Sequence, residues 1–166
     1  MWSGRRASVP KDDEVAAYMR RLAEVFVERT AAEGRAFGWD NASALRIDEL
    51  CEQYLSGRPD NEARHYFSIG VGAYLGELVV RNGRGRWVYE ANAQTPAIEI
   101  ADGRRCFPHH KVAKRLSLGP EHSIWAFYDF MMTGRLAPDM KLTRRDWSPD
   151  DRDGKPSNGT TYSDQP

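Results

Sequence analysis

The chain has 166 residues, of which 40% are hydrophobic and 29% are charged, and its 24 basic residues balance its 24 acidic ones. This composition is typical of a globular protein, and the length favours a single domain. The neutral balance argues against a dedicated nucleic-acid-binding protein, which is usually clearly basic.

Three helices are predicted in the N-terminal half, after a flexible arm over residues 1–10. The first begins at about residue 12, where acidic residues suit the positive end of the helix dipole, and ends at Gly34. The second extends from about residue 41 to Gly57. The third begins at Pro59 and ends near residue 83. Apolar residues recur at helical spacing in each helix. In the first helix they are Val15, Tyr18, Met19, Leu22, Val25 and Phe26.

The third predicted helix is unusual because it contains Gly70, Gly72 and Gly76. A glycine inside a helix costs roughly 1 kcal/mol relative to alanine, so something should offset that cost. Gly72 and Gly76 lie one turn apart beside an apolar stripe. We therefore expect another part of the backbone to approach the helix closely at these two positions.

A small sheet and two further helices are predicted next. Residues 86–91, 96–101 and 104–107 are expected to form strands, with Asp102-Gly103 as a hairpin turn. Pro108 fits the start of one helix and Pro120 the start of the last. The fold class is therefore α+β: a helical N-terminal half, a three-stranded antiparallel meander, and two C-terminal helices packed on one face of the sheet.

This arrangement predicts a single domain over residues 11–136. Residues 137–166 form a polar tail that we expect to be flexible, because it has too little apolar surface to offset the entropy of ordering. Trp147 is the exception, and it could anchor the tail onto the domain.

The thiols and the chain ends bear on the cellular compartment. Cys51 and Cys106 match no zinc-binding or redox spacing, so we expect buried free thiols. No apolar segment of a signal peptide follows the first residues, and no stretch approaches the roughly 18 apolar residues of a membrane span. We expect a cytoplasmic protein, and the frequent Arg, Ala and Gly residues point to a bacterial source.

Three segments carry a family resemblance. They are residues 43–50, residues 72–77 (Gly-Ala-Tyr-Leu-Gly-Glu) with Trp87 a short way on, and residues 108–116 with the run Lys-Val-Ala-Lys-Arg-Leu. Together they resemble uncharacterised bacterial domains from high-GC genomes, across roughly residues 40–130. The resemblance implies a shared α+β domain and no particular reaction.

Glu77, His109 and His110 are the candidate catalytic residues. A carboxylate in a glycine-containing helix could serve as a general acid or base if burial raises its pKa. The alternative is a carboxylate that is exposed or paired with Arg81, four residues on. The two histidines directly follow Pro108 at the start of a predicted helix, where free backbone N–H groups and Lys111 could attract an anion.

Other catalytic chemistry has little support in the sequence. His65, Glu77, His109, His110, His122 and the two cysteines show neither the HExxH nor the paired CxxC spacing of metal sites, so we expect no metal and no cofactor. Cys106 is close to His109 in sequence but fits a buried strand position better than a nucleophile.

Five residues are candidate partner contacts. Trp87 and Tyr89 would form a binding platform if their sheet face were uncovered, and the alternative is that both belong to the core. Bases outnumber acids between residues 104 and 135, where Arg104, Lys111 and Lys114 could add a basic patch. The alternative is a solvated helix face.

These observations favour a non-enzymatic protein-interaction module, such as an adaptor, accessory or immunity-type protein. The alternative is a small enzyme or biosynthetic accessory protein, with a pocket between the glycine-containing helix and the sheet and with Glu77 as the acid or base. A protein partner is expected first and an anionic small molecule second. Nucleic-acid binding through Lys111, Lys114 and Arg115 has weak support, and no membrane contact is expected.

Overall fold

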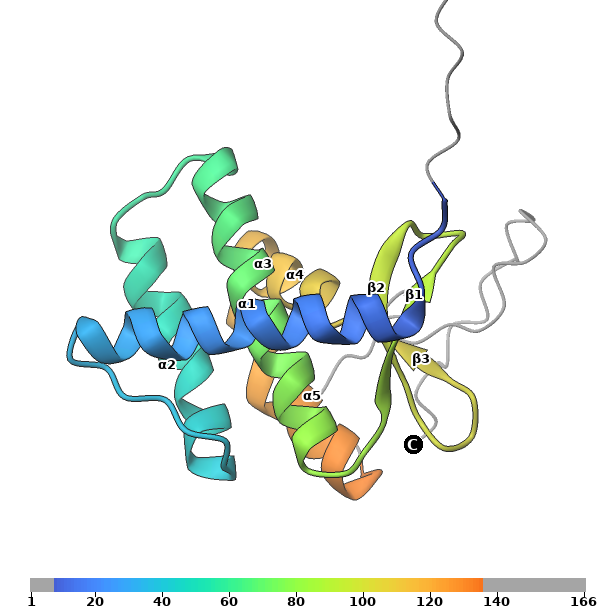
Figure 1. Cartoon of the computed structure of the whole chain (residues 1–166). Helices are drawn as coiled ribbons and strands as arrows, with labels where there is room; N and C mark the ends of the chain where they lie inside the picture. Colours follow the sequence, from blue (N-terminus) through green and yellow to red (C-terminus); the bar gives the residue numbers. More distant parts are fainter. Residues whose placement is uncertain (1–7, 136–166) are drawn as a thin grey trace, which may run out of the picture.

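The computed structural model describes residues 8–135, which form five α-helices and one three-stranded antiparallel sheet (Figure 1). The elements in chain order are α1 (Asp12–Ala32), α2 (Asn41–Ser56), α3 (Asn61–Arg81), β1 (Arg86–Glu90), β2 (Thr95–Glu99), β3 (Arg105–Cys106), α4 (Pro108–Leu118), the 3-10 turn η1 (Pro120–His122) and α5 (Ile124–Thr133). The predicted α+β class and its order of helices, meander and helices are confirmed.

The predicted polar tail with Trp147 lies outside the described residues, as does most of the predicted N-terminal arm. Within residues 8–135, no helix combines the length and the apolar character needed to cross a lipid bilayer.

Helix α2 begins at residue 41 as predicted, and the carboxylate of Asp40 caps it by accepting the backbone N–H of Ser43 at 2.8 Å. Two other helices begin later than predicted, and the first of them, α3, starts at Asn61 instead of Pro59. The last helix begins at Ile124 instead of Pro120, because residues 120–122 turn as a 3-10 helix and the Ser123 hydroxyl then accepts the N–H of Ala126. Proline fits the first turn of either helix type, so it could not distinguish the two.

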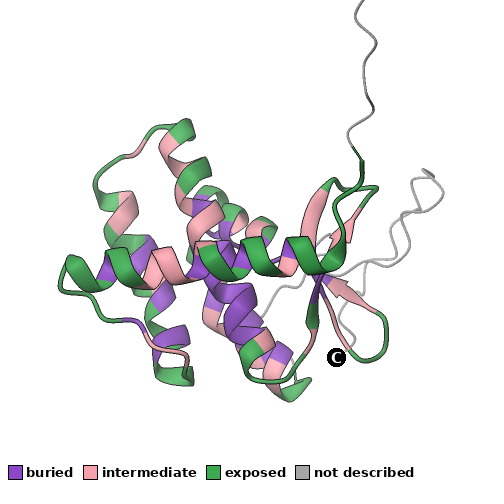
Figure 2. Ribbon diagram, in the orientation of Figure 1, coloured by how far each residue is buried: buried purple, intermediate pink, exposed green. Residues whose placement is uncertain are grey.

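Helix α3 is the centre of the molecule. Every residue from Val71 to Val79 is buried, and Figure 2 shows the central turns of this helix as the largest continuous buried segment. Helix α1 crosses α3 and α4 packs against it, and strands β1 and β2 contact α3 as well (Figure 1). Over these turns the helix is therefore buried on every side, and not only along the predicted apolar stripe.

The packing of the C-terminal helices differs from the expected arrangement. The sheet packs mainly against α1 and α3, whereas α4 packs on α3 and α5 packs on α2. In the sheet, Trp87 pairs with Ile98, and Ile98 pairs with Cys106, so these three residues share the face that joins the main core. The other face carries Arg86, Glu99 and Arg105, which are joined by ion pairs.

The glycines of α3 allow the close approach that the sequence predicts. A Cβ atom at Gly72 would lie 2.8 Å from the Cα of His109, at the start of α4. A Cβ atom at Gly76 would overlap the indole ring of Trp87 in β1. At Gly70, by contrast, a Cβ atom would meet nothing within 4 Å. The tight packing of α4 and β1 on α3 therefore offsets the cost of Gly72 and Gly76, but not that of Gly70.

Asp48 ties the C-terminal helices to α2. Its two carboxylate oxygens accept the backbone N–H groups of Ile124 and Trp125, both at 2.9 Å, and the hydroxyl of Ser123 at 2.8 Å. The same carboxylate accepts the Nε–H of the buried Arg115 from α4 at 3.0 Å. A side chain of α2 thus satisfies free N–H groups at the start of α5 and the charge of an α4 arginine.

The glycine contacts predict opposite effects for two alanine substitutions in α3. Gly76→Ala should lower the free energy of unfolding by about 1–3 kcal/mol, because the added methyl group must displace the buried Trp87 ring. Gly70→Ala should raise it by up to about 1 kcal/mol, because alanine favours the helix and has room there. Urea denaturation of both variants measures the difference. Equal effects would mean that the close approach at Gly76 is not real.

Candidate functional site

Glu77 lies inside the protein among three donors. Its side chain is 3% exposed, and its Oε1 accepts the Nε–H of Arg81 at 3.0 Å and pairs with Nε of Arg20 at 3.5 Å. Its Oε2 accepts the indole N–H of Trp87 at 3.1 Å. Arg81 is held in turn by the Trp39 ring, which lies 3.7 Å below its guanidinium, and by Glu24 at 3.3 Å.

These contacts make Glu77 the link between three elements, α1, α3 and β1. Both oxygens have partners and two guanidinium groups balance the charge, so the carboxylate matches the expected pairing with Arg81 and is not on an exposed face. A general acid or base must reach its substrate within hydrogen-bond distance, and this side chain has little open surface. A catalytic role for Glu77 stays a prediction.

His109 and His110 lie at the start of α4 in different environments. His109 sits against Gly72, its ring is 6.1 Å from the Trp87 ring, and its Nδ1 is buried without a hydrogen-bond partner in the described residues. Burial, with a smaller contribution from His110, lowers the pKa of His109 to about 4. His110 is exposed and stacks on Phe107 with ring centres 5.2 Å apart.

Glu77 and His109 both contact Trp87. They do not form an acid–base pair that faces an open cavity in this structure. Neither of the two cavities described below is lined by Glu77 or by a histidine.

The candidate partner contacts are mostly covered. Trp87 is 3% exposed and belongs to the main core, and Tyr89 is half-buried and packs against it. Lys111 is 1% exposed, Lys114 is half-buried, and Arg104 pairs with Asp102 across the β2–β3 hairpin. The structure thus gathers no open aromatic platform around Trp87. Partner contact by these residues stays a prediction.

The surroundings of the two cysteines bear on nucleophilic catalysis. Cys51 and Cys106 are free and buried, as expected, and burial raises the pKa of Cys51 to about 12 and also raises that of Cys106. Both thiols are therefore protonated and poor nucleophiles.

Nucleic-acid binding through Arg115 and a metal site also lack support among the described residues. Arg115 is engaged by Asp48 and Glu52, so its charge is already neutralised. Among the described residues, no group of three or more His, Cys, Asp or Glu side chains could hold a metal ion.

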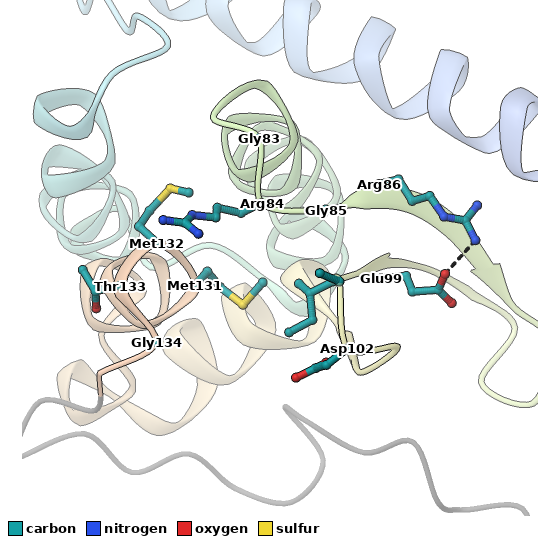
Figure 3. Close-up of a pocket in the computed structure, with 12 residues that line it drawn as sticks. Gly83, Arg84, Gly85, Arg86, Glu99, Asp102, Met131, Met132, Thr133 and Gly134 are labelled. Atoms are coloured by element: carbon teal, nitrogen blue, oxygen red, sulfur yellow. Dashed lines mark hydrogen bonds and ion pairs between the residues drawn. The ribbon is translucent and has the colours of Figure 1, made fainter.

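One cavity of about 730 Å³ lies where the turn after α3, the β2–β3 hairpin and the end of α5 meet (Figure 3). Met131 and Met132 line it from α5, and Arg84 and Arg86 line it from the other side. Arg86 already pairs with Glu99 at 2.6 Å, and none of the described residues that line this cavity is aromatic.

A second cavity of about 900 Å³ opens between α1, α2 and the first half of α3. We call it the three-helix groove. The side chains that line it are mostly apolar or aromatic, and they include Tyr18, Leu22, Val25, Phe26, Leu50, Tyr54, Pro59, Tyr66, Phe67 and Ile69. It exists because α2 meets α3 only sparsely, so the two helices do not close over the aromatic rings between them.

Two tyrosines at the groove are largely open to solvent in the described structure. Tyr18 and Tyr66 are 62% and 65% exposed, and they are among the most exposed large hydrophobic residues of the described chain. Tyr54 and Phe67 stack face to face inside it, with ring centres 3.8 Å apart. Contiguous exposed apolar surface of this kind marks binding sites.

The polar residues of the groove lie near the end of α1. Arg29, Glu33 and Arg35 line it there. Within the part of the chain that the structure describes, neither guanidinium group forms a hydrogen bond or an ion pair. The groove is thus apolar along most of its length. At one end it carries two arginines without partners in the described chain and a single carboxylate.

Sequence reasoning did not find this groove. The helical spacing of Tyr18 and Leu22 predicts the apolar face of the first helix, and nothing in that spacing separates a covered face from an open one. The useful signal was the large tyrosines at the edges of the stripes, since a tyrosine hydroxyl favours a wet boundary.

No protein-family model matches the chain, and no match was found among curated proteins or among solved structures. The resemblance to uncharacterised bacterial domains therefore stays an expectation, and the function must be argued from the geometry alone.

The contacts of Glu77 predict a structural effect when its charge is removed. Glu77→Gln should lower the free energy of unfolding by about 2–4 kcal/mol, because the charge that balances Arg81 and Arg20 is lost and the buried amide N–H₂ must face either these guanidinium groups or the Trp87 N–H. The matched control is Glu24→Gln, which removes an exposed carboxylate from the same Arg81 and should cost less than about 0.5 kcal/mol. Chemical denaturation measures both. A Glu77→Gln variant as stable as the wild type would show that the carboxylate is not needed for the fold and would favour a catalytic role.

The environment of His109 predicts a loss of stability in acid. Its folded pKa of about 4 lies below the value of about 6.5 expected in the unfolded chain, so the unfolded state alone binds a proton between these pH values. The free energy of unfolding should fall by about 2 kcal/mol between pH 7 and pH 5 from this group. His109→Phe, which keeps a planar ring that cannot titrate, should show a smaller fall over the same range. Parallel curves for the two proteins would contradict the buried neutral imidazole.

Proposed function

We propose that this chain is a non-enzymatic, cytoplasmic protein-interaction module and that the three-helix groove is its docking surface. The observation that carries the proposal is the pair of tyrosines at the groove, each more than 60% exposed, above a floor of stacked aromatic rings. Tyrosine is among the residues that contribute most to protein–protein binding when they become buried.

The polar groups of the molecule support the same reading. The carboxylates with the largest number of contacts, Glu77 and Asp48, hold helices and strands together rather than facing a cavity. His109 is neutral and covered at ordinary pH, and the free thiols are buried. Free buried cysteines also agree with a reducing compartment such as the cytoplasm.

The shape and size of the groove favour a protein segment as its occupant. Its volume of about 900 Å³ is near the upper end of the range for small-molecule pockets, roughly 300–1,000 Å³, and it is bounded by three helices that leave it open along their length. A folded segment of a partner would cover the exposed rings of Tyr18 and Tyr66 together.

Selection of displayed 16-residue peptides against the full chain tests the proposal. We expect enrichment of peptides whose affinity falls about 30-fold or more in the Tyr18→Ala, Tyr66→Ala double variant, because both rings would be buried on binding. The stability of that variant should stay within about 0.5 kcal/mol of the wild type, since both side chains are solvent-exposed in the free protein.

The matched control is Leu118→Ala, which removes a side chain that is 57% exposed on α4, an element that does not line the groove. This change should leave peptide affinity unaltered. Equal losses in both variants, or no enriched peptide at all, would refute docking in the groove.

A further inference from the structure

The backbone of the groove walls limits what can bind there. Apart from Glu33, Arg35, Gly57 and Pro59 at its edges, the groove is lined by helical residues, whose backbone N–H and C=O groups are bonded within the helix, and no strand of the described chain lines it. An extended peptide would bring unpaired backbone groups onto an apolar surface, at a substantial desolvation cost. A helix carries its own backbone hydrogen bonds, so it can meet an apolar groove with side chains alone.

The length of the groove can be read along α1. Tyr18, Leu22, Val25 and Arg29 line it at intervals of four, three and four residues, which is one continuous stripe of the helix. Eleven residues of helix rise about 16 Å, so the stripe matches about three turns of a docked helix.

The other wall has room for such a helix. Gly70 and Ala63 are among the residues by which α3 lines the groove, and a Cβ atom at Gly70 would meet nothing within 4 Å. The small side chains let a second helix approach α3 more closely than Tyr66 or Phe67 alone would allow.

The charges at the end of α1 point to the partner's chemistry. Arg29 and Arg35 lack partners in the described chain, and Glu33 is the only acidic side chain that lines the groove beside them. Burying a docked helix beside two unpaired guanidinium groups is favourable if that helix brings carboxylates.

We infer that the three-helix groove receives an amphipathic helix of a partner protein, about three turns long, with an apolar face and acidic residues at the end that lies against Arg29 and Arg35. This inference rests on the proposed function and specifies its partner.

The experiment uses displayed 16-residue peptides of four designs and the full chain. Three designs share a helix-forming scaffold with randomised apolar positions, and their last four polar positions at either end are fixed as Glu, Gln or Lys. The fourth design has the Glu ends and a central proline, which breaks the helix. We expect the helix-forming Glu design to be enriched about tenfold over the Lys design and over the proline design.

A charge-reversed protein provides the second measurement. In the Arg29→Glu, Arg35→Glu variant we expect the preference to invert, so that the Lys design exceeds the Glu design. Both arginines are exposed, so this variant should remain folded, and its thermal midpoint checks this. Inversion is an outcome that a non-specific loss of binding cannot give.

Each other outcome overturns a different statement. Enrichment of the proline design, dependent on Tyr66, would overturn the helix inference while the docking groove stands. Equal enrichment of the Glu and Lys designs would overturn only the inference that the partner helix carries acidic residues at one end. Self-association in ultracentrifugation that the Tyr66→Ala change abolishes would assign the groove to a second copy of this chain and overturn the partner helix.

Discussion

The fold depends on the way one indole ring meets the central helix. Trp87 lies on α3 at a position where only a hydrogen atom separates it from the backbone of Gly76, and its N–H points at the Glu77 carboxylate one residue further on. The same carboxylate holds Arg81 on its own helix and Arg20 on α1. This buried contact and the close approach at Gly76 fix a small sheet of short strands, which would be marginal alone, to α3, while Asp12 of α1 holds β1 by accepting the Tyr89 N–H at 2.9 Å and pairing with Arg86.

A second carboxylate organises the other side of the molecule, and the groove lies between the two regions that they stabilise. Asp48 joins α2 to the starts and sides of α4 and α5, whereas Glu77 joins α3 to α1 and the sheet. Neither tie reaches the last turns of α2 or the first turns of α3. Apart from the stacked rings of Tyr54 and Phe67, few contacts join α2 to α3, and Tyr54, Tyr66 and Phe67 stay partly open to solvent.

The sequence predicted what depends on nearby residues. Helix and strand order, the Asp102-Gly103 turn and the close approach at Gly72 and Gly76 all follow from local spacing and glycine chemistry. Of the partners of Glu77 and Asp48, only Arg81 could be predicted from local spacing. The others are far away in the sequence: Arg20 is 57 positions from Glu77, and Ile124 is 76 positions from Asp48. The groove was missed for a related reason: an apolar helical stripe has the same spacing whether a neighbouring helix covers it or not.

The position of Asp48 also couples the two ends of the domain during folding. The N–H groups that open α5 find their acceptor in a side chain 76 and 77 residues earlier, so this helix has a stable start only after α2 is in place beside it. Closing a loop of that length is slow relative to forming a helix turn. Asp48 therefore gains its full set of partners only when both α4 and α5 lie beside α2.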